Sequence, residues 1–120
     1  MAVDLEESGG KLLLNGEAIA TENQAWTGGI GYGQTWQDVT ASRALATDYT
    51  NSTGKPIQIS CTVRIGTDAW GQIMIDGVKV ASSRQNGISG YYDCLLSAIV
   101  PDGGIYSLTG TSLQFWSELR

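Results

Sequence analysis

Few side chains of this 120-residue chain suit acid–base or metal chemistry, and histidine is absent. Histidine is the commonest general base and a frequent metal ligand, so this chain lacks the residue that most often serves in acid–base catalysis and in metal binding. The carboxylates Asp48 and Asp68 could in principle form the pair that hydrolyses a glycosidic bond. Each lies among turn-forming residues, where an Asp side chain commonly bonds to nearby backbone instead. We therefore expect a protein that is not an enzyme.

Two cysteines, Cys61 and Cys94, each fall on the apolar face of an expected strand. Free cysteines are often buried, which favours two core thiols, and a disulfide between strands is the alternative. The first residues lack the positive region and apolar stretch of a secretion signal. We therefore expect maturation in a reducing cytosol, which disfavours the disulfide. Two thiols are too few ligands for a metal site, and we expect neither metal nor cofactor.

A glycine-rich stretch, Trp26–Gly33, looks at first like a phosphate-binding loop. No lysine follows it, no buried parallel strand precedes it and no helix begins after it, so a nucleotide site is disfavoured. The net charge of −5 also disfavours a nucleic-acid partner bound through its phosphates. We interpret the stretch as a link into the first strand of a β-sandwich.

Exposed aromatic rings are the most informative candidates for binding. Trp70 and Ile73 point to opposite faces of one expected strand, and Tyr91 and Tyr92 point to opposite faces of the next long strand. If these faces are exposed, each ring is a platform for a sugar or a protein contact. The alternative is burial of this second face against sister subunits of an oligomer.

Polar residues complete the candidate binding site. The turn Gly66–Asp68 and the loop Ser82–Gly90 are separated by two antiparallel strands, so we expect them at the same end of the domain. Arg84 and Asn86 of that loop can hydrogen-bond a carboxylated or hydroxylated glycan. The predicted binding residues are Asp68, Trp70, Arg84, Asn86 and Tyr91.

The elements that position these residues are strands. Ile57–Ile65 alternates apolar and polar residues without a break, which is typical of a strand with one buried face. Other strands are expected at Trp36–Val39, Asp48–Thr50, Ala69–Ile75, Val78–Val80 with both valines facing inward, Tyr91–Val100 with Tyr92 on its core face, and Ile105–Leu108 with Ser112–Leu119 as a last hairpin. Trp36 and Trp116 are expected to pack in the core, and Arg43 to be solvated in a polar loop.

Two-residue turns connect some of these strands. Asp76-Gly77 and Asn15-Gly16 are the residue pairs that type I′ hairpin turns require. The second pair joins Lys11–Leu14 to Glu17–Ala20, after an acidic arm that we expect to be mobile or ordered only by a partner. No segment shows a helical period, and turns recur at the spacing of an antiparallel sandwich. We predict an all-β, jelly-roll-like antiparallel β-sandwich over residues 25–120, preceded by the arm and hairpin over residues 1–24.

Several short segments form a recognisable pattern: Gly33–Thr40, Ser42–Leu45, Tyr49–Asn51, Gly54–Ile57, Asp76–Val78, Pro101–Ser107 and Gly110–Trp116. Over roughly residues 12–120 the pattern resembles the distal domain of bacteriophage and prophage tail-fibre proteins. Leu14–Gly16 and Ile19–Thr21 resemble the segments that join such tips to fibre shafts. The resemblance rests on turn and strand residues, and it carries over no catalytic signature and no defined receptor-contact residue.

This resemblance implies a non-enzymatic virion structural protein, made in the cytoplasm of a bacterial host and located in the tail fibre. It also implies a homotrimer attached through its N-terminal segment to other virion proteins, with a distal surface that binds a host cell-surface glycan or outer-membrane component. The alternative is a purely structural virion part without receptor binding, such as a head fibre, a capsid decoration protein or a tail connector. We expect no nucleic-acid partner and, because no apolar run is long enough to span a bilayer, no membrane insertion.

Overall fold

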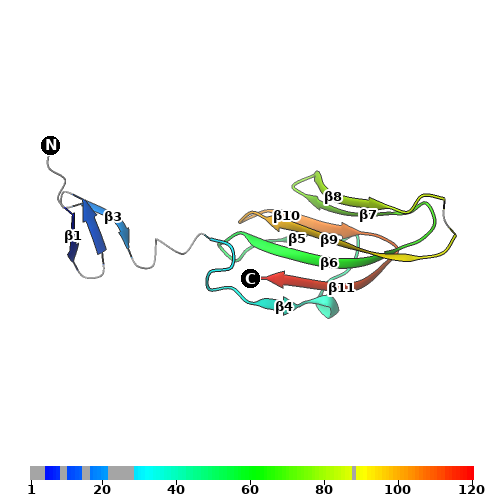
Figure 1. Ribbon diagram of the computed structural model, residues 1–120, viewed down its shortest axis with the longest axis horizontal. Coiled ribbons are helices and arrows are strands. Elements are labelled where there is room, and N and C mark those ends of the chain that lie inside the picture. Colours follow the sequence, from blue (N-terminus) through cyan, green and yellow to red (C-terminus); the bar gives the residue numbers. More distant parts are fainter. Residues whose placement is uncertain (1–4, 9–10, 15–16, 22–28, 88) are drawn as a thin grey trace.

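The computed structural model describes residues 5–8, 11–14, 17–21, 29–87 and 89–120 (Figure 1). Its elements are β1 (Leu5–Ser8), β2 (Lys11–Leu14), β3 (Glu17–Thr21), β4 (Trp36–Asp38), the 3-10 turn η1 (Thr40–Ser42), β5 (Tyr49–Thr50), β6 (Ile57–Ile65), β7 (Trp70–Ile75), β8 (Val78–Arg84), β9 (Tyr92–Val100), β10 (Ile105–Thr109) and β11 (Ser112–Leu119). Within the described ranges, no helix has the length and apolar character needed to cross a membrane.

Two antiparallel four-stranded sheets pack face to face, which confirms the predicted all-β sandwich (Figure 1). One sheet has the order β4-β11-β6-β9 and the other β5-β10-β7-β8. Every connection between consecutive strands from β4 to β11 crosses from one sheet to the other, except the β7–β8 hairpin. This strand order is that of an eight-stranded jelly roll, as the sequence predicted.

The predicted hairpin between Ile105–Leu108 and Ser112–Leu119 is wrong, because β10 and β11 belong to different sheets. The chain changes sheet at Gly110, where a Cβ atom would overlap the side chain of Val63 on β6. The next amide, Thr111 N, donates to the carbonyl of Arg64 at 2.9 Å. A residue without a side chain therefore lets the chain cross close to the end of β6.

The N-terminal strands form a separate three-stranded antiparallel sheet in the order β1-β2-β3. The predicted pairing of Lys11–Leu14 with the strand after it is confirmed, with Leu14 opposite Glu17, while the Asn15-Gly16 turn lies outside the described residues. Leu5–Ser8 of the expected arm pairs with β2 as a strand, which the sequence pattern did not predict. The predicted boundary between residues 24 and 25 also falls outside the described ranges.

The core lies between the two large sheets. Every predicted core-face residue of β6 is fully buried: Ile57, Ile59, Cys61, Val63 and Ile65. Cys61 and Cys94 are both buried free thiols, as predicted. Burial, together with the nearby Glu118 carboxylate, raises the pKa of Cys61 to about 12, so this thiol stays protonated at neutral pH.

Several predicted core positions are exposed instead. Val78 and Val80 are 60% and 47% exposed, because β8 is an edge strand and a β-bulge between Ala81 and Lys79 shifts its register. Trp36 is 52% exposed on the edge strand β4. Tyr92, also predicted to face the core, is half exposed at the start of β9.

A buried carboxylate, Glu118 on β11, organises one part of the core. It accepts hydrogen bonds from Arg43 at 3.0 and 3.2 Å, from Arg120 at 2.9 Å, from the Tyr106 hydroxyl at 2.8 Å and from the Trp116 indole at 3.2 Å. The expectation of a solvated Arg43 is therefore wrong. Burial and the Glu118 charge raise the pKa of Tyr106 to about 12, so its hydroxyl remains a donor.

Candidate functional site

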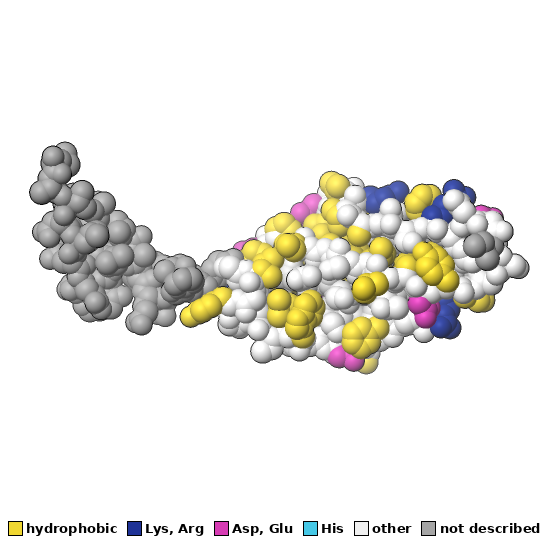
Figure 2. Space-filling model, in the orientation of Figure 1, with side chains coloured by type: hydrophobic (Ala, Val, Ile, Leu, Met, Phe, Trp, Pro, Cys, Tyr) yellow, Lys and Arg dark blue, Asp and Glu magenta, His cyan; other side chains and the backbone are white. Residues whose placement is uncertain are grey.

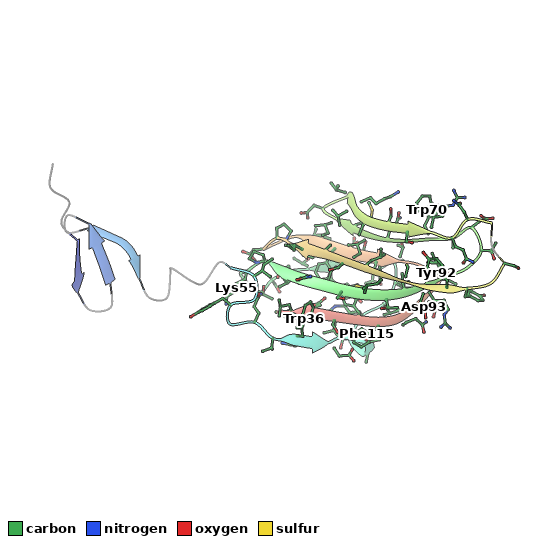
Figure 3. All side chains as sticks on the ribbon, viewed as in Figure 1. Trp36, Lys55, Trp70, Tyr92, Asp93 and Phe115 are labelled. Atoms are coloured by element: carbon green, nitrogen blue, oxygen red, sulfur yellow. The ribbon has the colours of Figure 1, made fainter. Side chains whose placement is uncertain are left out.

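The chain enters the sandwich at one end, and the turn after β6 lies at the other. At one end, Gln34 donates to the carbonyl of Pro56 at 2.9 Å, so the chain enters the sandwich beside the start of β6. β6 then runs to Ile65, and the turn Gly66–Ala69 follows it. Figure 3 shows Lys55 at the first end and Tyr92 and Asp93 toward the other. The second end is therefore the distal one relative to the start of the sandwich.

The loop between β8 and β9 is fastened to the Gly66–Ala69 turn at this distal end. Asp68 Oδ1 accepts from the Gly87 amide at 3.1 Å, and Thr67 Oγ1 accepts from the Gly90 amide at 3.2 Å. The amide of Gln85 donates to the carbonyl of Ala69 at 3.2 Å. These bonds confirm that the predicted turn and loop lie together, because they tie Gln85, Gly87 and Gly90 to the turn.

A hollow of about 410 Å³ lies beside this loop. Its lining residues are Arg84, Gln85, Asn86, Ser89, Tyr91 and Tyr92. The volume falls within the range of about 300–1,000 Å³ that is usual for small-ligand sites. The rim carries a 69% exposed ring, Tyr91, and the hydroxyl of Tyr92 is paired with Ser83 at 2.6 Å. We call this feature the distal hollow.

The Tyr91 ring is held in place by the turn beneath it. A Cβ atom on Gly66 would lie 3.3 Å from Cε1 of Tyr91, so the ring packs over a position without a side chain. The Gly66 amide in turn donates to Thr111 Oγ1 at 3.0 Å. The exposed ring thus rests on a braced turn, and less rotamer freedom is lost when a ligand stacks on it.

The structure brings together three of the five predicted binding residues, since Arg84, Asn86 and Tyr91 line the distal hollow. Asp68 is engaged with the loop backbone and supports the hollow from outside. Trp70 lies on the outer face of the β5-β10-β7-β8 sheet, where Arg84 crosses its ring. The other three lining residues, Gln85, Ser89 and Tyr92, were not in the predicted set. Alternation along β9 indicated an inward Tyr92 and did not show that the strand end is open.

A second hollow, of about 400 Å³, lies at the β7–β8 turn and is lined by Asp48, Met74, Asp76, Gly77, Ile105 and Ser107. Asp76 Oδ1 accepts from the amide of Ile105 at 2.9 Å, which gives it a structural role. Asp48 lies here, whereas Asp68 precedes the opposite end of β7, so the two do not form a carboxylate pair. Among the residues that the structure describes, no three metal-binding side chains gather.

Fold and site together define an all-β jelly-roll domain with a small aromatic and polar hollow at its distal end. Comparison of the chain with protein-family models, with curated proteins and with solved structures finds no match. Function is therefore argued from the chemistry of the hollow and from the resemblance of the sequence pattern.

Asp68→Ala is expected to loosen the loop that carries the hollow. The substitution removes the acceptor for the Gly87 amide and places alanine at a φ of 56°, which only a few residue types tolerate. The loop should lose about 1 kcal/mol of local stability. Hydrogen exchange of the Gly87 amide should accelerate several-fold while global unfolding changes little. Asp68→Asn keeps an acceptor oxygen and tolerates this φ, so unchanged exchange in both variants would contradict the assigned role.

Proposed function

We propose that this chain is a non-enzymatic receptor-binding tip of a phage tail fibre and that its distal hollow binds a host cell-surface glycan. The observation that carries the proposal is the position and chemistry of the hollow. It lies at the end of the sandwich away from Gln34, where the chain enters, and it combines a braced Tyr91 with Arg84 and Asn86. The assignment to a tail fibre is supported by the sequence pattern described above.

A sugar suits the groups that line the distal hollow. The flat, exposed ring of Tyr91 offers an apolar face for the C–H side of a pyranose. Arg84 and Asn86 supply donors and an acceptor at the edge, where sugar hydroxyls would lie. An exposed, shallow arrangement of this kind binds through a few contacts, so affinity for one site is weak and several copies strengthen attachment.

Tyr91→Ala is expected to abolish binding of the labelled protein to host cells. Loss of the ring removes the stacking surface, which is worth up to about 1.5 kcal/mol or roughly tenfold in affinity at each site. Several linked sites multiply this loss. Tyr32→Ala is the matched control, because this ring is 56% exposed and belongs to the segment at the opposite end. Equal binding by Tyr91→Ala and the parent chain would refute the proposed site, and release of reducing ends from host polysaccharide would refute the non-enzymatic assignment.

A purely structural role in the virion is the second candidate, and one surface favours it. The outer face of the β4-β11-β6-β9 sheet carries large exposed side chains: Leu95 at 69%, Ile99 at 56%, Trp36 at 52% and Phe115 at 46%. Figure 2 shows hydrophobic side chains distributed over this face. Small hydroxyl residues, Ser60, Ser97 and Ser117, form a row between them. We call this surface the apolar sheet face, and it suits contact with a second copy of the chain.

The apolar sheet face leads to a test of the proposed homotrimer. Light scattering at micromolar concentration should give about three times the chain mass of 12.8 kDa. Leu95→Glu should dissociate the assembly, because a charge at the centre of an apolar contact is strongly unfavourable. Ile105→Glu is the control, since Ile105 is 46% exposed on the other sheet. A monomeric parent chain would contradict the trimer and weaken the fibre assignment.

A further inference from the structure

Two cations gather on one ring near the distal hollow. Lys79 Nζ lies 5.0 Å from the centroid of the Trp70 ring, and Arg84 Cζ lies 5.3 Å from it. Both distances are within the reach of about 6 Å over which an indole attracts a cation. Figure 2 shows basic side chains at this edge, over β7 and β8. Both positive charges therefore lie against the same indole ring.

In the described part of the sandwich, these two cations lack the acidic partners that three of its arginines have. Arg43 and Arg120 both pair with Glu118, and Arg64 pairs with Asp93. Within residues 29–87 and 89–120, neither Lys79 nor Arg84 forms an ion pair. In a chain with a net charge of −5, a pair of unneutralised cations on one ring is a local site for an anion.

The β-bulge in β8 creates this arrangement. Because the register shifts after Ala81, Lys79 stands opposite Met74, whose side chain lies on the outer face together with that of Trp70. Strict alternation from Lys79 to Arg84 would place these two side chains on opposite faces of the sheet. Bulges characteristically redirect a side chain, and this one puts both on the outer face. The bulge thus lets Lys79 and Arg84 share the Trp70 ring.

Arg84 connects the two features, because it lies over Trp70 and also lines the distal hollow. We propose that the ligand of the distal hollow is an acidic saccharide, with its carboxylate held by Arg84 and Lys79 and its sugar ring on Tyr91. This inference rests on the proposed function and adds the chemical class of the receptor. A guanidinium matches the two oxygens of a carboxylate with parallel hydrogen bonds, and the ammonium adds a second charge. Trp70 positions the cations and does not itself stack on the sugar.

Glucuronate and glucose are suitable probes, since they differ in whether the terminal carbon is a carboxylate or an alcohol. In NMR titrations of the full chain, glucuronate should shift the Trp70 indole and Tyr91 ring signals and bind at least tenfold more tightly than glucose. Raising the salt from 50 to 300 mM should weaken glucuronate binding several-fold, because screening acts on the exposed cations. Inorganic phosphate is the control for a general anion site and should bind more weakly than glucuronate.

Charge-removing variants separate this inference from the proposed function. Lys79→Gln and Arg84→Gln should each weaken glucuronate at least fivefold, and Lys55→Gln, a cation at the opposite end, should not change it. Equal affinity for glucose and glucuronate, tighter binding of phosphate, or no shift with glucuronate would each overturn the acidic-saccharide assignment. Any of these results leaves the proposed function standing if Tyr91→Ala still loses cell binding. Cell binding that survives Tyr91→Ala is the separate result that removes the proposed function.

Discussion

Glu118→Ala is expected to lower the free energy of unfolding by roughly 3–5 kcal/mol. The Glu118 side chain is fully buried, and it neutralises Arg43, whose own side chain is only 13% exposed. Removing the carboxylate leaves that guanidinium in the core without its counter-charge. The Tyr106 hydroxyl and the Trp116 indole would also lose their acceptor. Breaking one partner of a buried pair is strongly unfavourable, because the remaining charge is neither solvated nor paired.

Urea denaturation followed by tryptophan fluorescence would measure this effect. Asp93→Ala is the matched control, because Asp93 also pairs with an arginine, Arg64 on the neighbouring strand, but on the exposed face of the same sheet. Exposed pairs contribute little to stability, so Asp93→Ala should change the urea midpoint only slightly. Similar midpoints for the two variants would show that the Glu118 cluster is not the electrostatic centre of the core.

Asn51→Asp is expected to destabilise the fold by roughly 3–5 kcal/mol at neutral pH, although the two side chains have nearly the same shape. The Asn51 amide nitrogen donates to three carbonyl oxygens, those of Lys55 at 2.7 Å, Val100 at 3.1 Å and Pro101 at 3.1 Å. Its amide oxygen accepts from the amide and hydroxyl of Thr53. A carboxylate would face the three carbonyls with a negative charge and no proton to donate. Asn51 is 1% exposed, so water cannot compensate.

The same charge change at an exposed asparagine provides the control for this prediction. Asn86→Asp lies on the loop of the distal hollow and should leave the unfolding free energy nearly unchanged. The Asn51→Asp protein should also recover stability as the pH falls, because protonation restores one donor and removes the charge. Wild-type stability of Asn51→Asp at neutral pH would contradict the assigned role of Asn51 in tying the Asn51–Lys55 turn to the end of β9.

Substitutions that change stability and substitutions that change ligand binding are expected at different positions in the fold. Glu118 and Asn51 stabilise the sandwich from within, whereas Tyr91 and Arg84 lie on its exposed distal end. Substitutions at the distal end should therefore change ligand binding in a folded protein. Asp68 belongs to neither group, because it affects the site only through its hydrogen bond to the loop backbone.

The sequence by itself determined those features that depend on local chemistry. Strict alternation over Ile57–Ile65 defined a strand with one buried face, because side chains alternate between the faces of a sheet. Asp76-Gly77 defined the β7–β8 hairpin, because both residues adopt the positive φ that a type I′ turn needs. Three members of the candidate site were also predicted: Arg84, Asn86 and Tyr91. The turn after β6 and the loop after β8 are joined by two antiparallel strands, so they had to lie at the same end of the sandwich.

Only the tertiary structure decided which side of an alternating strand meets another sheet and which meets water. Trp36 lies on the outer face of its sheet, opposite Leu119, whereas Trp116 lies on the inner face, opposite Cys61, so one ring is half exposed and the other is buried. Arg43 looked like a solvated loop residue because its partner, Glu118, is distant in sequence. Lys79 and Arg84 share the Trp70 ring through a bulge that no alternation pattern encodes. These outcomes depend on pairing between strands far apart along the chain, and local propensity carries no information about such pairing.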